Sequence, residues 1–351
     1  MSPSSPFRQL LDPVPEGVIR PMWSVMIPTY NCAKYLKGTL ESVLQQDLGP
    51  DMMQIMVIDD CSTQDDPEAI VREIGKGRVE FYRQPKNVGL IENFRTSLGK
   101  SRGYLVHQLH GDDQVRPGFY KKLKVAFETN PEVGAAFCRT ISMDENEHWT
   151  NLTDLERHTS GVLPKEWPQR LATICCILTP SIVVRREAYE KLGSFDGQFI
   201  CAEDWEMWAR IAMSYPIWYE VEPLALYRSA SGSNTHRNIL NGRYIEDSYL
   251  ATQMIHSYFS QDLPFSQDLP EETKRIPYRN WAFSALGTAK MLLKEGKLIP
   301  AIPHVQSALR YQTSYLVLRS LLAILIFHLP PALLKSVFQH SPSILHSRAK
   351  P

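Results

Sequence analysis

Residues 104–113, YLVHQLHGDD, contain the features that decide the fold. The first six residues form a short, mostly apolar run of the kind that builds a buried strand. A histidine, a glycine and two adjacent aspartates, Asp112 and Asp113, follow directly. The two carboxylates therefore stand at the carboxyl end of a predicted strand, which is the edge at which open α/β sheets bind ligands.

Three more short apolar runs precede this strand. They are WSVMIP at 23–28, QIMVI at 54–58 and VEFYR at 79–83. Each is followed by a stretch with apolar residues at helical spacing. These residues are Leu36, Leu40, Val43 and Leu44, then Ile70, Val71 and Ile74, then Leu90, Phe94 and Leu98. Strands that alternate with helices predict an α/β domain with a largely parallel sheet.

Composition is that of a folded protein and excludes some functions. The chain has 351 residues, of which 43% are hydrophobic and 22% charged, and this length suggests two domains or one domain with an appendage. The 38 basic residues balance 38 acidic ones, so we expect no nucleic-acid partner. Neither GxGxxG nor GxxxxGK[ST] occurs in the sequence, which argues against dinucleotide and P-loop chemistry.

The cysteines and the N-terminus indicate a reducing compartment. Six cysteines in a chain of this length make no disulfide framework, and no CxxC pair suggests zinc. The first 17 residues, MSPSSPFRQLLDPVPEG, lack a basic start followed by an apolar segment. We therefore predict buried free thiols, no signal peptide and a cytoplasmic location.

Two further acidic pairs lie at comparable places. Asp59 and Asp60, in VIDDCST, end the second predicted strand. Glu203 and Asp204, in FICAEDWEMWARIA, stand in the first turn of a predicted helix, where the helix dipole favours negative charge. Each pair alone has a structural interpretation, as a turn or as a helix cap.

Taken in order, these motifs resemble those of family 2 glycosyltransferases, which are inverting enzymes with the GT-A fold. The stretches that carry the resemblance are SVMIPTYNCAKYLKGTLESVLQQD, MVIDDCSTQD, NVGLIENFRTSLGKSRGYLVHQLHGDD and AEDWEMWARI. The resemblance implies an α/β fold with a Rossmann-like, mainly parallel sheet flanked by helices and a mainly helical C-terminal extension. We predict an N-terminal lead at 1–21, a catalytic domain at 22–237 and the helical region at 238–351.

The resemblance also implies a donor site for a nucleotide-diphosphate sugar, most often a UDP-sugar. By position, the residues against the nucleotide are Pro28, Thr29, Tyr30 and Asn31, and Asp60 accepts a hydrogen bond from the base. Asp112 faces the ribose or a metal, and Asp113 is a direct ligand of Mn²⁺ or Mg²⁺. Such hard cations are held by carboxylates together with substrate phosphates, and they neutralise the departing diphosphate.

The histidine of this stretch departs from the family pattern. Many relatives carry an acidic residue where this chain has His110. A neutral imidazole can ligate Mn²⁺, or His110 can serve only to shape the turn, and both interpretations stay open. We expect His107, on the strand itself, to be a packed or hydrogen-bonded histidine.

The catalytic roles implied by the resemblance fall on Asp204 and Glu203. An inverting transfer needs one carboxylate to take the acceptor's hydroxyl proton, and Asp204 corresponds to that general base. Glu203 supports geometry or acceptor binding and is the second candidate for the base. We expect a glycan or lipid-linked acceptor and a role in polysaccharide or cell-envelope synthesis.

A later stretch, LYRSASGSNTHR, resembles the family's Tyr-Arg-x-His-x-Gly-Ser segment, which can close over the diphosphate. Arg228, Gly232 and Ser233 match, whereas Ala230 occupies the histidine position. We predict that Arg228 contacts the donor.

The C-terminal tail is apolar and basic. Residues 297–351 contain no Asp or Glu and six basic residues. Within segment 315–338, the uncharged stretch between Arg319 and Lys335 has 15 residues, fewer than the ~20 of a spanning helix. We predict peripheral contact of 315–338 with the cytoplasmic membrane face. A helix buried against the catalytic domain and an oligomer interface are the alternatives.

Two other functions use part of the same pattern. A Mg²⁺-dependent phosphoryl hydrolase would employ VIDDCST, but it leaves residues 28–31 and the Glu203–Asp204 pair unexplained. A non-catalytic GT-A relative that serves as a binding or scaffold module would have no chemical need for both Asp113 and Asp204.

Overall fold

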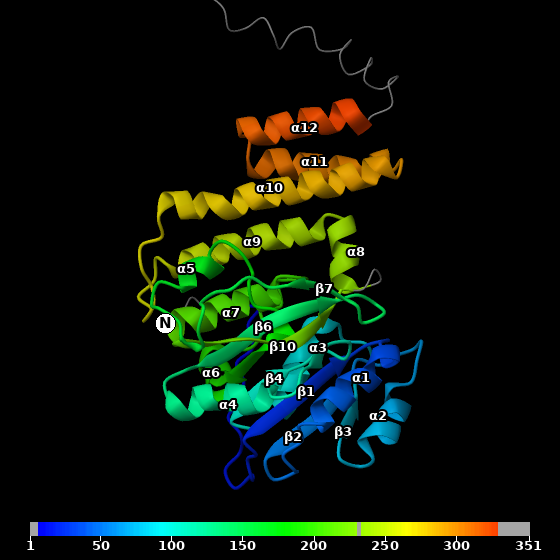
Figure 1. Ribbon diagram of the computed structural model, residues 1–351, viewed down its shortest axis with the longest axis vertical. Coiled ribbons are helices and arrows are strands. Elements are labelled where there is room, and N and C mark those ends of the chain that lie inside the picture. The colour runs from blue at the N-terminus through cyan, green and yellow to red at the C-terminus, as the bar shows by residue number, and fades with distance from the viewer. Residues whose placement is uncertain (1–5, 230–232, 329–351) are drawn as a thin grey trace, which may run out of the picture.

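The computed structural model describes residues 6–229 and 233–328 of the chain (Figure 1). Four parallel strands form the first half of one sheet, in the spatial order β3-β2-β1-β4. They are β1 (Trp23–Thr29), β2 (Met53–Asp59), β3 (Glu80–Arg83) and β4 (Leu105–Gln108). These are the four strands that the apolar runs predict.

The intervening segments are helical, as their apolar spacing predicts. They are α1 (Ala33–Leu44), α2 (Pro67–Gly75) and α3 (Leu90–Lys100). All seven residues of β1 are buried, since helices cover both faces of the sheet at this central strand. Burial on both faces explains why β1 is mostly apolar, with Ser24 and Thr29 as buried exceptions.

Beyond β4 the sheet is mixed. β9 (Ile182–Arg185) is antiparallel to both β4 and β6 (Ala135–Met143), and β10 (Ile217–Arg228) runs parallel to β6. The short β5 (Gln114–Val115) is antiparallel to β10. Two further short strands, β7 (Trp149–Leu152) and β8 (Gly161–Val162), pair with β6 and β10. The pairing of β10 with β5 brings the end of β10 next to the acidic turn that follows β4.

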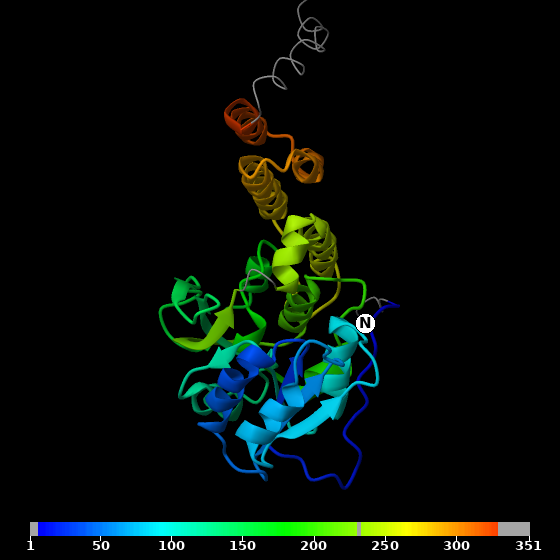
Figure 2. The same cartoon turned by 90° about the vertical axis from the view of Figure 1, so that its right-hand side faces the viewer.

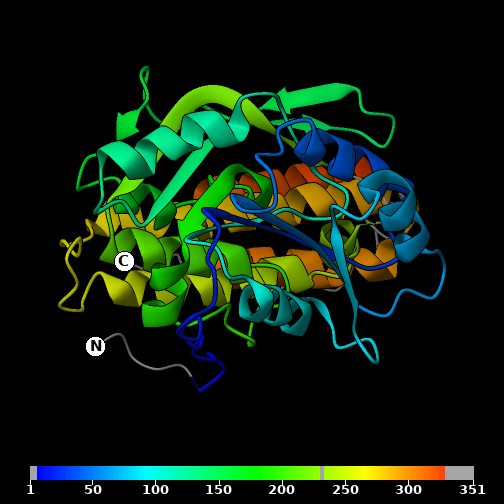
Figure 3. The same cartoon turned by 90° about the horizontal axis from the view of Figure 1, so that it is seen from below.

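Helices cover the two faces of the sheet (Figure 3). One face packs against α1, α2 and α4 (Phe119–Thr129) through a core that includes Val25, Leu40 and Leu123. The other packs against α3, α6 (Arg186–Leu192) and α7 (Glu203–Ser214), with Phe94, Tyr189 and Trp208 in its core. A short helix, α5 (Pro168–Leu171), and a 3-10 turn, η1 (Thr179–Ser181), lie in the connection between β8 and β9.

From Asn234 onward the described chain is helical, as predicted for the C-terminal extension. The helices are α8 (Asn234–Leu240), α9 (Arg243–Tyr258), α10 (Glu271–Lys294), α11 (Leu298–Tyr311) and α12 (Tyr315–His328). α9 packs on α7, α10 packs on α9, and α11 and α12 pack on α10, so the helices rise from the sheet as a stack (Figures 1 and 2). None of the helices in the described ranges is long and apolar enough to cross a membrane.

Candidate active site

The ends of β1 and β2 are tied together by Asn31, one of the predicted nucleotide contacts. Its backbone has a positive φ of 49°, and its Oδ1 accepts hydrogen bonds from the N–H groups of Thr63 and Gln64, at 2.9 and 3.1 Å. The Asn31 N–H donates to the Ser62 Oγ at 2.8 Å. Asn31 therefore braces the loop after β2.

The other three predicted nucleotide contacts lie at the same strand end. Thr29 is buried and its Oγ1 lies 2.7 Å from the Cys32 Sγ, while the Pro28 carbonyl accepts the N–H of Gly111 at 3.1 Å. The Tyr30 ring is exposed. Of these three side chains, Tyr30 is the one open to a ligand.

The two adjacent aspartates at the end of β2 have different hydrogen-bond partners. Asp59 accepts hydrogen bonds from Ser62 and, at 2.7 Å, from the Arg83 Nε, so it builds the turn. Asp60 accepts the N–H of Val88 at 2.7 Å on Oδ1 and the N–H of Gly89 at 3.0 Å on Oδ2. Burial raises the pKa of Asp60, although these two N–H groups favour its charged form. Asp60 thus fixes the backbone just before α3.

A close approach of two backbones makes glycine necessary at position 111. A Cβ at Gly111 would lie 2.8 Å from the Thr29 Oγ1 and 2.9 Å from the Cys32 Sγ. The Thr39 Oγ1 also donates to the Gly111 carbonyl at 3.0 Å. The acidic turn is therefore packed directly against the end of β1 and the start of α1.

His110, Asp112 and Asp113 bring possible metal-ligating atoms within 4.8 Å of one another. The Asp113 Oδ1 accepts the N–H of Arg228 at 2.8 Å, while its Oδ2 is buried and has no hydrogen-bond partner among the described residues. The His110 Nδ1 lies 3.6 Å from that Oδ2, and the His110 ring stacks on Phe94 at 5.2 Å.

The negative charge of this cluster is only partly compensated by Arg228. Burial, and then the negative charge of Asp112, raise the pKa of Asp113 well above its ordinary value. Burial lowers the pKa of His110, so the imidazole is neutral at physiological pH. Two carboxylates and a neutral imidazole, with one Asp113 oxygen unpartnered among the described residues, are a donor set that fits Mn²⁺ or Mg²⁺.

Arg228 lies behind the acidic turn. Its side chain is 0% exposed, and its Nε donates to the Asp112 carbonyl at 2.9 Å. The two terminal nitrogens donate to the Asp144 carbonyl at 3.1 Å and to the Glu147 Oε1 at 2.9 Å, and the guanidinium sits 4.3 Å from the Tyr35 ring centroid. In this geometry Arg228 braces the turn, and its contact with a donor stays a prediction.

The other positions of the LYRSASGSNTHR stretch that the sequence analysis named are Ser233, Ala230 and Gly232. Ser233 caps α8, because its Oγ accepts the N–H of His236 at 3.1 Å. Ala230 and Gly232 lie outside the described residues.

The predicted catalytic carboxylates, Glu203 and Asp204, lie in the first turn of α7. The Asp204 Oδ1 accepts the N–H of Trp205 at 2.6 Å, and its Oδ2 accepts the Thr179 Oγ1–H at 3.1 Å. Burial raises the pKa of Asp204 to about 6. Burial and then the charge of Asp204 raise the pKa of Glu203 to about 8. At neutral pH, Asp204 is therefore a base and Glu203 an acid, which is the separation that acid–base enzymes use.

The η1 turn connects the acidic strand to this pair. The Pro180 carbonyl lies 3.0 Å from the His107 Nε2, and because a carbonyl only accepts, that nitrogen donates. The other ring nitrogen then accepts the Tyr120 O–H at 3.1 Å. This confirms His107 as a hydrogen-bonded strand residue. It also links β4, through Pro180 and its neighbour Thr179, to Asp204.

Tyr227 is a site residue that sequence reasoning missed. Burial and then the charges of Asp113, Asp112 and Asp204 raise the pKa of its phenol. The charges of Asp112, Asp113 and Asp204 therefore all act on the Tyr227 phenol. The signal was present in the sequence, since Tyr227 precedes Arg228 in the LYR stretch.

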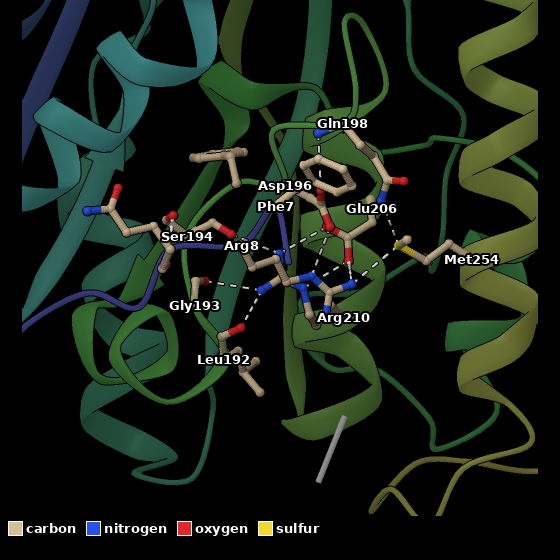
Figure 4. Close-up of polar contacts among 12 residues, drawn as sticks. Phe7, Arg8, Leu192, Gly193, Ser194, Asp196, Gln198, Glu206, Arg210 and Met254 are labelled. Carbon is tan, nitrogen blue, oxygen red and sulfur yellow. Dashed lines mark hydrogen bonds and ion pairs between the residues drawn. The ribbon is translucent and has the colours of Figure 1, made fainter. Parts of the chain in front are cut away.

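A buried ion network holds α7 in place (Figure 4). The Glu206 carboxylate accepts from the Arg210 Nε at 2.9 Å and from an Arg8 terminal nitrogen at 3.0 Å, and it also accepts the Tyr258 O–H. The Arg8 Nε pairs with Asp196 at 3.1 Å. Two positive and two negative charges balance, and they join the N-terminal segment, α7 and α9.

Comparison with known proteins agrees with this architecture. Residues 24–193 match the family model described as Glycosyl transferase family 2. An uncharacterized protein of Mycobacterium tuberculosis is 28% identical over 240 residues, which are 65% of this chain and 73% of that protein. An N-acetylglucosaminyltransferase of Mesorhizobium japonicum is 30% identical over 182 residues, 51% of this chain but only 42% of that enzyme.

Solved structures also resemble most of this architecture, and one example illustrates the likeness. It is S. aureus TarS 1–349 in complex with UDP-GlcNAc, with a TM-score of 0.55 and 16% sequence identity. The match covers 84% of this chain and 93% of that one. At this identity the likeness concerns the fold.

Proposed function

The chain belongs to glycosyl transferase family 2 and has a GT-A fold, and on that premise we propose that it is an inverting enzyme. It transfers a sugar from a nucleotide-diphosphate donor to an acceptor hydroxyl. The observation that carries the proposal is the common location of two unlike acidic sets. The Asp113 Oδ2 has no hydrogen-bond partner among the described residues, and Asp204 is ionised at neutral pH. The contacts of His107 with Pro180 and of Thr179 with Asp204 join the strand before the acidic turn to the proposed base.

A divalent cation would be held by the free Oδ2 of Asp113 and the carboxylate of Asp112, with His110 beside them. When bound, it neutralises the charge that develops on the departing diphosphate. The Arg228 N–H holds the other Asp113 oxygen, so the carboxylate is oriented before the donor arrives.

The proton transfer falls to Asp204. As the acceptor oxygen attacks the anomeric carbon, the Asp204 carboxylate takes the hydroxyl proton and the nucleotide diphosphate leaves from the opposite face. No covalent sugar–enzyme intermediate is needed. Thr179 and the Trp205 N–H fix the orientation of the carboxylate. Glu203, protonated at neutral pH and with a buried Oε2 that has no partner among the described residues, supports acceptor binding and is the second candidate for the base.

We infer that the donor is a UDP-sugar. The fold neighbour binds UDP-GlcNAc, and the Mesorhizobium relative is an N-acetylglucosaminyltransferase. Tyr30, with its exposed ring, and Asp60, at the end of β2, are the residues proposed to meet the nucleotide. The acceptor is proposed to be a glycan or lipid-linked hydroxyl, in polysaccharide synthesis.

Helix α12 supports a peripheral membrane contact. Val317, Leu321 and Ile324 are buried against the helix stack. The remaining surface of α12 exposes Arg319 together with large apolar side chains, which are Tyr315, Leu316, Leu318, Leu322, Ile326 and Phe327. A helix that is apolar on its outer side and carries a basic residue suits an anionic membrane surface. Residues 329–338 of the predicted segment lie outside the described residues.

The contacts of Asp59 and Asp60 argue against the phosphoryl hydrolase. A nucleophilic carboxylate needs a free oxygen, whereas Asp59 is bound by Ser62 and Arg83, and both Asp60 oxygens accept backbone N–H groups. Incubation with UDP-GlcNAc, Mn²⁺ and a panel of glycan acceptors tests the two functions directly. We expect UDP release coupled to sugar transfer, and a rise in apparent stability with UDP-GlcNAc that EDTA reduces. Hydrolysis of simple phosphate esters without sugar transfer would favour the hydrolase instead.

A further inference from the structure

A carboxylate from the helical stack binds the backbone just before α7. It belongs to Asp247 of α9, a residue that is 7% exposed. One of its oxygens, Oδ2, accepts three consecutive backbone N–H groups at 2.9, 2.7 and 2.8 Å, those of Ile200, Cys201 and Ala202. Glu203 and Asp204 follow immediately in the sequence. The anchor point is therefore two residues from the proposed base.

The local sequence of α7 provides no cap of its own. The N-cap residue is Ala202, which makes no side-chain hydrogen bond, and alanine is among the poor residues at this position. A helix N-terminus leaves backbone N–H groups without intrahelical partners and concentrates positive potential. Asp247 satisfies the N–H groups leading into the helix and brings the negative charge that this end favours.

The contacts of Asp247 hold a loop segment, residues 200–202, which belongs to no helix or strand. Residues 200–202 connect the turn at Asp196 to α7, and the described strands of the sheet do not include them. The first turn of α7 is also held to α9 by the Tyr258 O–H, which donates to Glu206. The hydrogen bonds of Asp247 add a second point of attachment at the same end of α7, where the chemistry takes place.

We propose that Asp247 is a positioning residue for the transfer reaction, which fixes residues 200–202 and so aims the Asp204 carboxylate at the acceptor. This inference rests on the role of Asp204 as the base proposed above. It makes α9 part of the catalytic unit, although α9 lies outside the residues that match the family model.

The charge of Asp247 acts on the same carboxylates. Burial raises the pKa values of both Asp204 and Glu203, and the negative Asp247 raises them further. Titratable groups from several elements share electrostatic interactions with Asp204: Glu203 of α7, Asp247 and Tyr244 of α9, Tyr227 of β10, and Cys175 and Cys201 of the loops. Burial raises the pKa values of the two tyrosines and two cysteines, so all four are neutral at neutral pH. Asp247 is therefore the carboxylate of α9 whose replacement changes the field at Asp204.

Two variants separate geometry from charge, with transfer measured from UDP-GlcNAc and Mn²⁺ by the full-length chain. Asp247→Asn removes the charge and weakens the anchor. We expect kcat to fall by as much as ~100-fold, the loss that a misplacement of about 1 Å can cause, with the donor KM little changed. Because Asp247 raises the pKa of Asp204, the acid limb of the kcat profile should move to lower pH. Asp247→Glu keeps the charge but displaces the carboxylate, so kcat should fall without that shift.

The matched control is Glu246→Gln, which removes an exposed carboxylate from the same helix and should leave kcat and its pH profile unchanged. Amide hydrogen exchange at residues 200–202 gives a readout that does not need activity. It should accelerate in Asp247→Ala and not in Glu246→Gln. If Asp247→Ala fails to fold, the Asn variant carries the test, because it retains a carbonyl acceptor.

The outcomes distinguish this inference from the function on which it rests. Near wild-type transfer by Asp204→Asn would contradict the base itself. Loss of transfer in Asp204→Asn together with an unchanged kcat and acid limb in Asp247→Asn would overturn the positioning role alone. Faster exchange at 200–202 with unchanged kinetics would reduce Asp247 to a structural cap and equally overturn it.

Discussion

The backbone N–H of Arg228 donates a hydrogen bond to the Asp113 Oδ1 at 2.8 Å, which joins the last residue of β10 to the acidic turn after β4. The bond occupies one carboxylate oxygen and leaves Oδ2 buried, with no hydrogen-bond partner in the described part of the chain. The carboxylate therefore has a fixed orientation and one oxygen available to a cation.

Replacement of Asp113 by Asn tests that arrangement. The amide oxygen can still accept the Arg228 N–H, but the second position becomes an NH₂ group, which cannot ligate a cation. We expect UDP affinity in Mn²⁺ to fall ~10–100-fold, in the range found when groups that support a metal are lost. Calorimetry with EDTA should show little difference from wild type. Asp268→Asn, an exposed change in the loop before α10, is the control, and equal affinities of wild type and Asp113→Asn in Mn²⁺ would contradict the assignment.

Replacement of Asp204 by Asn separates binding from chemistry. The amide nearly preserves the shape and the contacts with Thr179 and Trp205, but it cannot take a proton. We expect kcat to fall ~10²–10⁴-fold, as for loss of a general base, with donor affinity unchanged. Near wild-type turnover would move the base elsewhere, and Glu203→Gln is then the variant to examine.

The pKa values of this pair predict a bell-shaped kcat profile. Activity should rise through pH ~6, since the pKa of Asp204 is raised to about 6 and its ionised form is the base. It should fall above pH ~8, where Glu203, whose pKa is raised to about 8, loses its proton. Glu203→Gln keeps a neutral side chain at every pH, so it should abolish the alkaline limb and retain the acid limb. A profile of Glu203→Gln with both limbs intact would show that the proton of Glu203 has no part in turnover.

The network around Glu206 predicts a large effect on stability. Glu206→Gln leaves Arg8 and Arg210 buried without their shared counter-charge, and removal of one partner from a buried pair costs about 3–5 kcal/mol. Burial opposes ionisation of Glu206, but the two arginines hold its pKa below the ordinary value of 4.5. A depressed pKa stabilises the fold above that value, and the contribution is lost as pH falls through the folded-state pKa. Urea unfolding at pH 7 should show the difference, whereas Glu68→Gln, in an exposed pair with Arg72, should change stability by less than ~1 kcal/mol.

The outer face of α12 predicts binding to anionic vesicles. Full-length protein should co-sediment with vesicles that contain anionic lipid, less so at high salt, because the charge of Arg319 is screened. The double change Leu318→Gln and Leu322→Gln removes two exposed apolar side chains and should release the protein. Binding to neither anionic nor neutral vesicles would contradict membrane contact. A change of oligomeric state in the double variant would identify the face as an interface between chains.

The first half of the fold could be predicted because its signals are local. Burial on both faces makes β1 a mostly apolar run, and the helices that follow β1, β2 and β3 keep their apolar residues at helical spacing. The second half carries weaker signals, since β9 has four residues and pairs antiparallel with two strands from distant parts of the chain. A run of that length does not specify its direction or its neighbours.

Positions of the acidic residues could be predicted, but their individual surroundings could not. Asp59 and Asp60 look alike in the sequence, and only the fold shows that one accepts from Arg83 and the other from the backbone before α3. Arg228 matches a motif, yet its guanidinium points into a pocket made by Asp144, Glu147 and Tyr35. Asp247 carries no sequence signal, because its partners lie 45–47 residues away along the chain.

Two attachments between α7 and α9, through Asp247 and through Tyr258, bear on how this chain can be divided or recombined. A fragment that stops after β10 would retain every described strand of the sheet but lose both residues of α9 that hold the N-terminal end of the base-bearing helix. The helical stack is therefore not an interchangeable module, and a hybrid that takes the sheet from one homologue and the stack from another must restore both contacts to remain active. For the same reason, we expect substitutions at the contacting positions of α7 and α9 to occur together among homologues.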